Sequence, residues 1–371
     1  MNKKLFAAIA TLCGTIIGAG FLGIPYVASK SGFIIGLFWI VVLGLVMLYV
    51  KLCIGEVILR TKGRHQLTGY AEKYLGKTGK ILMFFAMFFG IYSALVAYLI
   101  GQGESLSFLF FGNIGNTLLM GIVFFALMGF LTYQGFNALK KWESVAMIIV
   151  LSVIFLIFVY FSPNIKLENL SGFNPSNFFV PFGVVLFALL GTAAMPEVER
   201  ILFREEKLLK KTVVIGSLIP IIVYIIFTLV VVGSFVQIPE VSTLALGKIF
   251  VFLGIITMFT AYFSISIAIR DMYRFDFGLS RTKSWFLANA APFILFLLIQ
   301  IFGLASFIQI LNMGGIVAGG LTAITVLLMN YKAKKFGNRN PEYEIKINWL
   351  IIILLSLLFI AGVVFGLGLF G

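Results

Sequence analysis

Charged residues are what this sequence has least of. Asp, Glu, Lys and Arg make up 11% of its 371 residues, whereas hydrophobic residues make up 61%. Soluble domains carry about 25% charged residues, and the mean hydropathy of this chain is +1.10. A chain of this length cannot bury so much apolar surface in one soluble core, so we predict a polytopic membrane protein.

Cysteine and histidine are also scarce. Both cysteines, Cys13 and Cys53, lie in apolar segments, so we predict no disulfide framework. His65 is the single histidine, and the sequence has no Walker phosphate-binding motif. A membrane-embedded enzyme would need clustered His, Asp or Glu, and an ATP-driven pump would need that motif. We therefore expect neither enzymatic activity nor a cofactor.

Long apolar segments separated by short polar ones fill the chain. The basic start MNKKLF leads into an apolar run without a small-residue cleavage site, so we expect a first helix and no cleavable signal peptide. We predict an all-α fold with eleven transmembrane helices, at residues 5–28, 33–57, 80–111, 117–139, 142–162, 176–197, 212–234, 244–270, 285–303, 306–331 and 349–370.

Lys and Arg are concentrated in every second polar segment between the predicted spans. With the N-terminus inside, all 28 Lys and Arg residues fall in inner segments except Lys30, Lys51, Lys166 and Lys248. This is the positive-inside pattern, and it predicts a multi-pass protein of the cytoplasmic membrane with its N-terminus inside and its C-terminus outside. The basic surface then faces the cytoplasm and anionic lipid headgroups, so the net charge of +14 requires no nucleic acid partner.

Two of the predicted spans contain helix-breaking residues at corresponding positions. The first carries CGTIIGAGFLGIPY (residues 13–26), with four glycines and Pro25, and the sixth carries FALLGTAAMPE (187–197). Interrupted helices at corresponding positions of inverted halves are the best sequence sign of a secondary transporter's binding site.

Eleven spans divide as five, five and one, and a half with an odd number of spans enters the membrane inverted relative to the other. We predict a 5+5 inverted repeat with discontinuous first and sixth helices. Its halves are residues 1–162 and 163–331, and residues 332–371 hold a cytoplasmic loop and a peripheral eleventh span.

Helix packing is the alternative explanation of the glycines. Gly14 and Gly18 form a G-x-x-x-G motif, which often marks a close helix contact and nothing more. Gly20 and Gly23 follow too closely for a regular packing seam. We therefore expect Gly18 and Gly20 to serve the backbone geometry of a break and not packing.

A break within the membrane frees backbone groups that need partners. The outer half of the first span begins near Gly20 and offers amides, which suit a carboxylate. The inner half ends near Gly14 and offers carbonyls, which suit an ammonium or another cation, and the sixth span frees carbonyls near Phe187, Ala188 and Leu190. A zwitterionic amino acid matches both sets. Since we expect no ionisable side chain at either break, we predict a neutral amino acid with an apolar or aromatic side chain.

Five segments resemble the amino acid–polyamine–cation superfamily, and most closely its hydroxy/aromatic amino acid permeases and amino acid/auxin permeases. They are GTIIGAGFLGIPY (14–26), YSALVAYLIGQGESL (92–106), FALLGTAAMPEV (187–198), LNMGGIVAGG (311–320) and NPEYEIK (340–346). Gln102 and Glu104 depart from the glycines of that family's third span. The resemblance implies the fold of the bacterial sodium-coupled leucine transporter, with a ten-helix core.

The resemblance also implies site residues. Those implied to face the carboxylate are Thr15, Gly18, Ala19 and Gly20. Those implied to line the amine and side-chain pocket are Phe187, Ala188 and Gly191. Those implied to wall the site are Tyr92 and Ser93, or Tyr98 one to two turns later.

The coupling ion stays open between sodium and a proton. The resemblance implies a sodium site formed by carbonyls of Gly14 and Ile17 with hydroxyls of Thr260 and Ser264. Ile265 stands where sodium-coupled members often have a second hydroxyl. For a proton, the fifth span lacks the Lys that some relatives use. The other candidates are ionisable residues that lie near span ends, Glu56, Glu104 and Glu197. Lys51 lies deeper than Glu56, but its long side chain can snorkel inward.

The segment LTGYAEKYLGKTGK (67–80) alternates apolar and charged residues at helical spacing, which predicts an amphipathic helix at the inner surface. Such a helix would obstruct the inner exit or simply face lipid. We expect a monomer that binds an amino acid and membrane lipid and works as a symporter by alternating access. The alternative is an amino acid sensor on the same scaffold, which would bind without accumulating its ligand.

Overall fold

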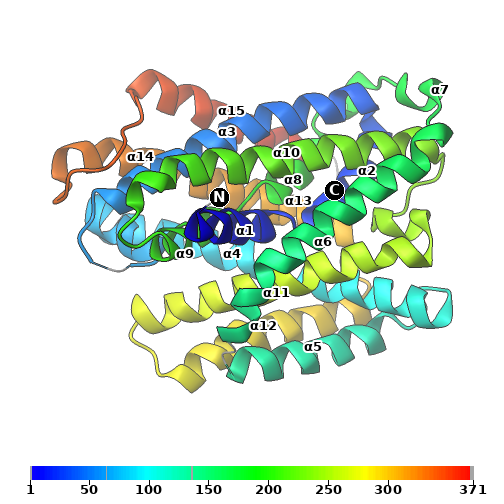
Figure 1. Cartoon of the computed structure of the whole chain (residues 1–371), viewed down its shortest axis with the longest axis horizontal. Helices are drawn as coiled ribbons and strands as arrows, with labels where there is room; N and C mark the ends of the chain where they lie inside the picture. The colour runs from blue at the N-terminus through cyan, green and yellow to red at the C-terminus, as the bar shows by residue number, and fades with distance from the viewer. Residues whose placement is uncertain (1, 64, 135–136, 368–371) are drawn as a thin grey trace.

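The structure is a computed structural model that describes residues 2–63, 65–134 and 137–367. Its helices run side by side across Figure 1, and their ends gather at the left and right of that view. Within the described residues, ten helical segments are long and apolar enough to cross a membrane, and a bent pair of helices makes an eleventh span. The same residues contain no strand, so the all-α prediction is confirmed.

The first half of the chain supplies the first five spans. Its helices are α1 (Lys3–Ile16), α2 (Gly20–Ser31), α3 (Phe33–Leu59), α4 (Leu67–Phe111), α5 (Thr117–Gln134) and α6 (Asn137–Phe161). The pair α1 and α2 forms the first span, and α4 contains the third.

The second half supplies the other spans. Its helices are α7 (Leu167–Leu170), α8 (Val180–Ala188), α9 (Met195–Ile201), α10 (Leu209–Ser234), α11 (Lys248–Phe275), α12 (Arg281–Phe302), α13 (Phe307–Gly314), α14 (Gly320–Phe336) and α15 (Trp349–Leu367). Short 3₁₀ turns lie at Ser162–Asn164, Pro175–Asn177, Thr192–Ala194 (η3), Glu206–Leu208 and Ser242–Leu246, and a π-helical turn at Gly315–Gly319 joins α13 to α14.

The first span breaks where its glycines cluster. The helix α1 ends at Ile16, two residues beyond the predicted Gly14, and α2 begins at Gly20 as predicted. Ile17 between them has φ −81° and ψ 79°, outside the helical region, and the two helix axes differ by 49°. Pro25 lies inside α2, where it cannot donate a backbone hydrogen bond.

The sixth span breaks in the same manner. The helix α8 ends at Ala188, and α9 begins at Met195 with Pro196 in its first turn, where the missing N–H costs little. Gly191 between them has φ +148°, a conformation that favours glycine. The prediction of discontinuous first and sixth helices is therefore confirmed.

The segment before the third span is an amphipathic helix of its own. Gly76 has φ +72° and ψ −163° and divides α4 there. Before this kink Tyr70 and Tyr74 are buried, while Glu72 and Lys73 are exposed. At the start of this helix, Asp276 accepts hydrogen bonds from the amides of Gln66 and Gly69, at 3.3 and 3.1 Å, and from the Thr68 hydroxyl.

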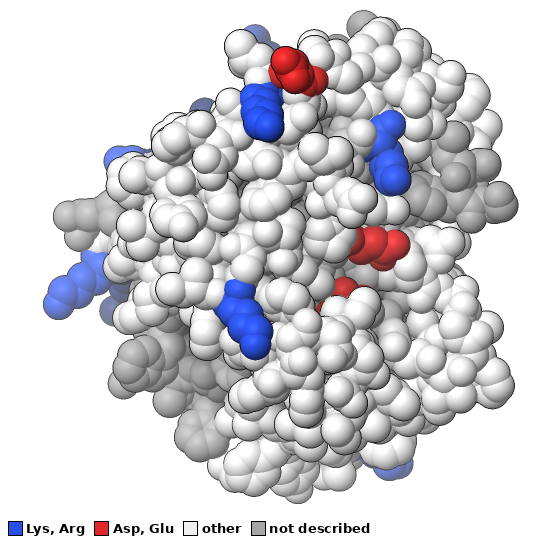
Figure 2. All heavy atoms as spheres, turned by 90° about the vertical axis from the view of Figure 1, so that its right-hand side faces the viewer, with Lys and Arg blue, Asp and Glu red and all other residues white. Residues whose placement is uncertain are grey.

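The outermost helix packs against few others. The helix α15 contacts α14, α8 and the π-helical turn, and it exposes Leu350, Leu354 and Leu357. It is peripheral, as predicted. Figure 2 shows the end of the molecule that lies at the right of Figure 1, and that face carries few charged side chains.

Candidate functional site

The two helix breaks meet inside the molecule. The helix α2 packs along α8, and the contact is closest at Gly20. A Cβ atom added to Gly20 would stand 2.5 Å from the Cα of Ala188. The amides at the start of α2 therefore lie beside the last carbonyls of α8, and the N-cap residue, Ala19, makes no side-chain cap.

A cavity of about 70 Å³ lies at this meeting point. It is bounded by both breaks, by α4, by α11, by the π-helical turn and by the start of α14. Six of the ten residues predicted for the substrate line it: Thr15, Gly20, Tyr98, Phe187, Ala188 and Gly191. Most of its other lining side chains are apolar, including Met87, Ile91, Leu190 and Ile265. The cavity thus offers backbone donors and acceptors at one end and an apolar wall at the other.

Gly18 and Ala19 adjoin this cavity through Tyr98. The Tyr98 hydroxyl hydrogen-bonds the backbone of Ala19. A Cβ atom on Gly18 would stand 2.2 Å from the same hydroxyl oxygen. Neither Gly18 nor Gly20 has a positive φ, whereas Gly191 does. Our expectation that backbone geometry and not packing requires these two glycines is therefore wrong, because neither has a conformation that needs glycine and each stands at a close approach, Gly18 to Tyr98 and Gly20 to the backbone of Ala188.

Tyr92 and Ser93 lie elsewhere. They line a separate cavity of about 530 Å³ between α4, α12 and α13. The Tyr92 hydroxyl is 2.9 Å from the Tyr273 hydroxyl and donates to the carbonyl of Leu287 at 2.7 Å. The structure brings Tyr98 and not Tyr92 or Ser93 to the breaks.

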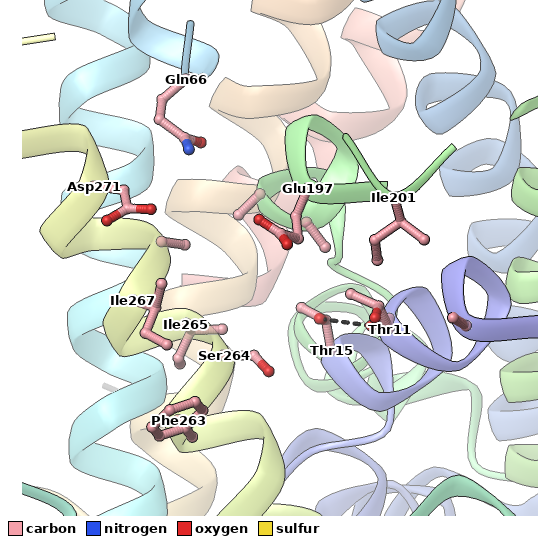
Figure 3. Close-up of a pocket in the computed structure, with 14 residues that line it drawn as sticks. Thr11, Thr15, Gln66, Glu197, Ile201, Phe263, Ser264, Ile265, Ile267 and Asp271 are labelled. Carbon is pink, nitrogen blue, oxygen red and sulfur yellow. Dashed lines mark hydrogen bonds between the residues drawn. The ribbon is translucent and has the colours of Figure 1, made fainter. Parts of the chain in front are cut away.

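A larger cavity of about 290 Å³ connects the breaks to one end of the molecule. Figure 3 shows its walls, with Thr11 and Thr15 on α1 facing Ser264 and Ile265 on α11. Thr15 and Ile265 also line the central cavity, so the two cavities adjoin. The Thr15 hydroxyl donates to the carbonyl of Thr11 at 2.9 Å and is turned along α1, away from the start of α2.

Two carboxylates stand at the end of this cavity that lies away from the breaks. Glu197 on α9 and Asp271 on α11 both line it, together with Gln66 at the start of the amphipathic helix. Each has a basic neighbour: Arg200 lies 3.0 Å from Glu197, and Arg270 lies 3.1 Å from Asp271. The amphipathic helix therefore begins beside the mouth of the cavity.

The four residues predicted for sodium are brought together. Gly14, Ile17, Thr260 and Ser264 line one small cavity of about 10 Å³ between α1 and α11. The Ser264 hydroxyl points toward α1 in Figure 3. The Thr260 hydroxyl lies 3.0 and 3.1 Å from the carbonyls of Ile256 and Thr257 on its own helix. A cavity of this size is near the lower limit for one water molecule.

Two residues at the breaks were not predicted for the site. The Tyr224 hydroxyl on α10 lies 2.8 Å from the carbonyls of both Ile16 and Ala188, so it ties the end of α1 to the end of α8. The Lys51 ammonium on α3 donates to the carbonyl of Leu189 at 2.9 Å. Lys51 is 1% exposed, so it does not snorkel inward, and the prediction that no ionisable side chain lies near a break is wrong.

Lys51 did carry a sequence signal. It is a lysine within a 27-residue apolar helix, and an ionisable residue inside a membrane span is a functional candidate by default. Tyr224 carried none, because a tyrosine in an apolar helix is most often a packing residue.

Glu56 belongs to a separate cluster at the C-terminal end of α3. Its carboxylate accepts hydrogen bonds from Arg60 at 2.8 Å, Lys334 at 2.9 Å and Asn330 at 3.1 Å. The backbone N–H of Ile345 donates to it as well, at 2.8 Å. This arrangement joins α3, α14 and the segment before α15, and it lies outside the cavities.

The sequence pattern of the tryptophan/tyrosine permease family matches residues 1–366. The chain belongs to this family. The resemblance to aromatic amino acid permeases that the sequence motifs indicated is therefore confirmed.

Proteins with assigned transport activities are similar over about three-fifths of their length. Tyrosine-specific transport system 1 of Haemophilus influenzae is 26% identical over 64% of this chain and 59% of its own. Glutamine transporter 2 of Aliivibrio fischeri is 24% identical over 63% of this chain and 62% of its own. This chain thus spans less than two thirds of either relative.

One solved structure matches over nearly the whole fold. The structure of MhsT in complex with L-phenylalanine superimposes with a TM-score of 0.69, at 13% sequence identity, and covers 97% of both chains. This match confirms the LeuT-like fold class, with its discontinuous helices.

Proposed function

We propose that this protein is a secondary transporter that carries neutral amino acids with large apolar or aromatic side chains across the cytoplasmic membrane. The observation that carries the proposal is the meeting of two broken helices at one apolar cavity. The uncapped start of α2 is suited to a carboxylate, and the end of α8 is suited to an ammonium. Membership of a permease family and the assigned activities of the relatives support it.

The wall of the cavity supports the preference for an uncharged side chain. Phe187, Met87 and Ile91 line it, and none of the described residues that line it is Asp, Glu, Lys or Arg. A charged side chain would be buried there without a partner, which costs several kcal/mol. One relative is named as tyrosine-specific, and MhsT was solved with L-phenylalanine.

Alternating access would use the cavities that adjoin at Thr15 and Ile265. The cavity of about 290 Å³ is open toward the end of the molecule where Asp271 and the amphipathic helix lie. The positive-inside pattern assigns that end to the cytoplasm, so we propose that the structure represents an inward-facing arrangement, with the N-terminus inside and the C-terminus outside. The two halves, 1–162 and 163–331, would move against each other around the breaks, while residues 332–371 stay peripheral.

We further propose that a cation gradient drives uptake. The cavity lined by Gly14, Ile17, Thr260 and Ser264 is the proposed sodium position, and a proton is the alternative cation. We propose that the protein works as a monomer surrounded by lipid, with no nucleic acid partner and no catalytic step.

Counterflow in proteoliposomes tests the proposal. Liposomes that hold the purified protein are loaded with one unlabelled amino acid, and the entry of its labelled form is measured without any ion gradient. We expect counterflow with tyrosine, tryptophan, phenylalanine or leucine, and little with lysine or glutamate. Counterflow with the charged amino acids alone would refute the proposed substrate class.

The same measurement separates a transporter from a sensor. A sensor would bind these amino acids, as a thermal shift would show, but would not exchange them. Binding without counterflow would therefore overturn the proposed function in favour of the sensor.

A further inference from the structure

Lys51 is a buried charge without a counter-charge. It lies in α3, 1% exposed, and its ammonium donates to the carbonyl of Leu189. Among the described residues, no carboxylate pairs with it. The ionised carboxylate on the same helix, Glu56, is occupied by Arg60 and Lys334. An ammonium in such a position costs free energy, and an uncharged amine does not carry that cost.

The single partner of this ammonium belongs to the break itself. Leu189 is the C-cap residue that follows α8, so its carbonyl lies at the negative end of the helix dipole. The neighbouring carbonyl of Ala188 is held by Tyr224. A Cβ atom on Gly191 would stand 3.4 Å from the Cε of Lys51. Lys51 therefore lies behind the break and does not line the central cavity.

Several elements surround Lys51, and two of their titratable groups lie at the breaks. The Cys13 thiol of α1 is near enough to interact electrostatically with the ammonium, and the Tyr224 hydroxyl binds the next carbonyl. The helix α8 and the turn η3 contribute no ionisable side chain. The other titratable or charged residues on packed elements are Tyr26 and Lys30 of α2, Tyr49, Cys53 and Glu56 of α3, Glu197, Glu199 and Arg200 of α9, Lys210 and Lys211 of α10, and Tyr331, Lys332, Lys334 and Lys335 of α14.

We propose that Lys51 carries the coupling proton. This role rests on the proposed function and identifies the ion that drives amino acid transport. As an ammonium, Lys51 holds the Leu189 carbonyl and orders the end of α8, where Ala188 lines the central cavity. Protonation and amino acid binding then stabilise the same arrangement, which is the condition for symport.

Release of the proton loosens this arrangement. The ammonium gives its proton to water that enters from the inner side and becomes a neutral amine. A neutral donor forms a weaker hydrogen bond with the Leu189 carbonyl than a charged one does. The end of α8 is then free to shift, and the empty carrier returns outward to bind the next proton.

The test uses the full-length protein in liposomes that contain a pH-sensitive dye. Labelled tyrosine, tryptophan, phenylalanine and leucine serve as probes, with sodium present or replaced by choline. We expect the wild type to acidify the lumen when a transported amino acid is added outside. We expect K51Q to retain counterflow within about threefold, but to lose lumen acidification and to accumulate at least about tenfold less amino acid under an inward proton gradient.

K51R keeps a positive donor that does not release its proton. We expect K51R to fail in proton-driven accumulation as K51Q does, and K248Q, which alters an exposed lysine, to behave like the wild type. Amino acid-dependent acidification by K51Q, or recovery of proton-driven accumulation in K51R, would overturn the proposal. So would loss of counterflow in both variants, because Lys51 would then build the site.

The wild type separates this inference from the proposed function. Counterflow without amino acid-dependent acidification would refute the proton-carrying role of Lys51 and leave the transporter standing. Absence of counterflow with every probe would refute the transporter itself.

Discussion

Gly20 and Ala188 bring the two broken helices into backbone contact. A Cβ atom on Gly20 would lie 2.5 Å from the Cα and 2.9 Å from the backbone nitrogen of Ala188. Backbone atoms cannot turn aside as the end of a flexible side chain can. The contact therefore sets how closely the amides of α2 approach the carbonyls of α8, and these are the groups to which we assign the two ends of the proposed amino acid substrate.

Gly20→Ala is predicted to weaken amino acid binding by about tenfold or more, because forcing one methyl group into a packed contact costs about 1–3 kcal/mol. Gly14→Ala is the matched control in the same span, since a Cβ atom there would meet nothing within 4 Å. Binding is measured by the thermal shift that tyrosine or tryptophan produces. Equal affinity in Gly20→Ala and Gly14→Ala would contradict the role of this contact.

Tyr224→Phe is predicted to destabilise the protein by about 1–3 kcal/mol, because its hydroxyl is the hydrogen-bond partner of two buried carbonyls, and an unsatisfied buried group costs about that much. Tyr262→Phe is the control. The Tyr262 hydroxyl is buried on α11 and has no hydrogen-bond partner among the described residues. We expect a lower thermal midpoint in Tyr224→Phe than in Tyr262→Phe, and the reverse order would refute the link between α1 and α8.

The breaks could be predicted because their cause is local. Glycine and proline disfavour a helix wherever they stand, so the cluster from Gly14 to Pro25 marks the first break without knowledge of any neighbour. The sixth span offered Gly191 and Pro196 in the same way. The positions of the eleven spans followed from apolar length alone.

The partners of the breaks could not be predicted, because they depend on the rotation of other helices. Tyr92 and Tyr98 are six residues apart, which places them about 120° apart around the helix. Since α4 is apolar on most of its surface, the sequence does not show which of them faces the breaks. Lys51 of α3 and Tyr224 of α10 also contact the breaks. Lys51 binds the carbonyl of Leu189 and Tyr224 binds that of Ile16, and in each pair the two residues are more than a hundred positions apart in the sequence.

Glu56→Gln is predicted to destabilise the protein by about 3–5 kcal/mol, because Arg60 and Lys334 would lose the fully buried carboxylate between them. Glu344→Gln removes the other partner of Arg60. The Glu344 side chain is 66% exposed, so its loss should cost less than about 1 kcal/mol. Thermal unfolding in detergent compares the two variants, and similar midpoints would show that the Glu56 cluster contributes little.

Ser264→Ala tests the sodium position against the proton. If Lys51 carries the coupling proton, replacement of sodium by choline should leave proton-driven uptake by the wild type unchanged. Ser264→Ala should then stay within about twofold of the wild type, as expected for loss of one hydroxyl that binds no ion. Ser266→Ala is the matched control two residues along α11, where the hydroxyl lies 3.3 Å from Asn289 and not beside α1.

The contrary result is equally specific. Uptake by the wild type that requires sodium, is lost in Ser264→Ala and survives in Ser266→Ala would place the ion between α1 and α11. The cavity lined by Gly14, Ile17, Thr260 and Ser264 would then be the sodium site, with two carbonyls and two hydroxyls as ligands. In that case the Leu189 carbonyl would be held by a permanently charged Lys51, and K51R should support sodium-driven uptake as well as the wild type does.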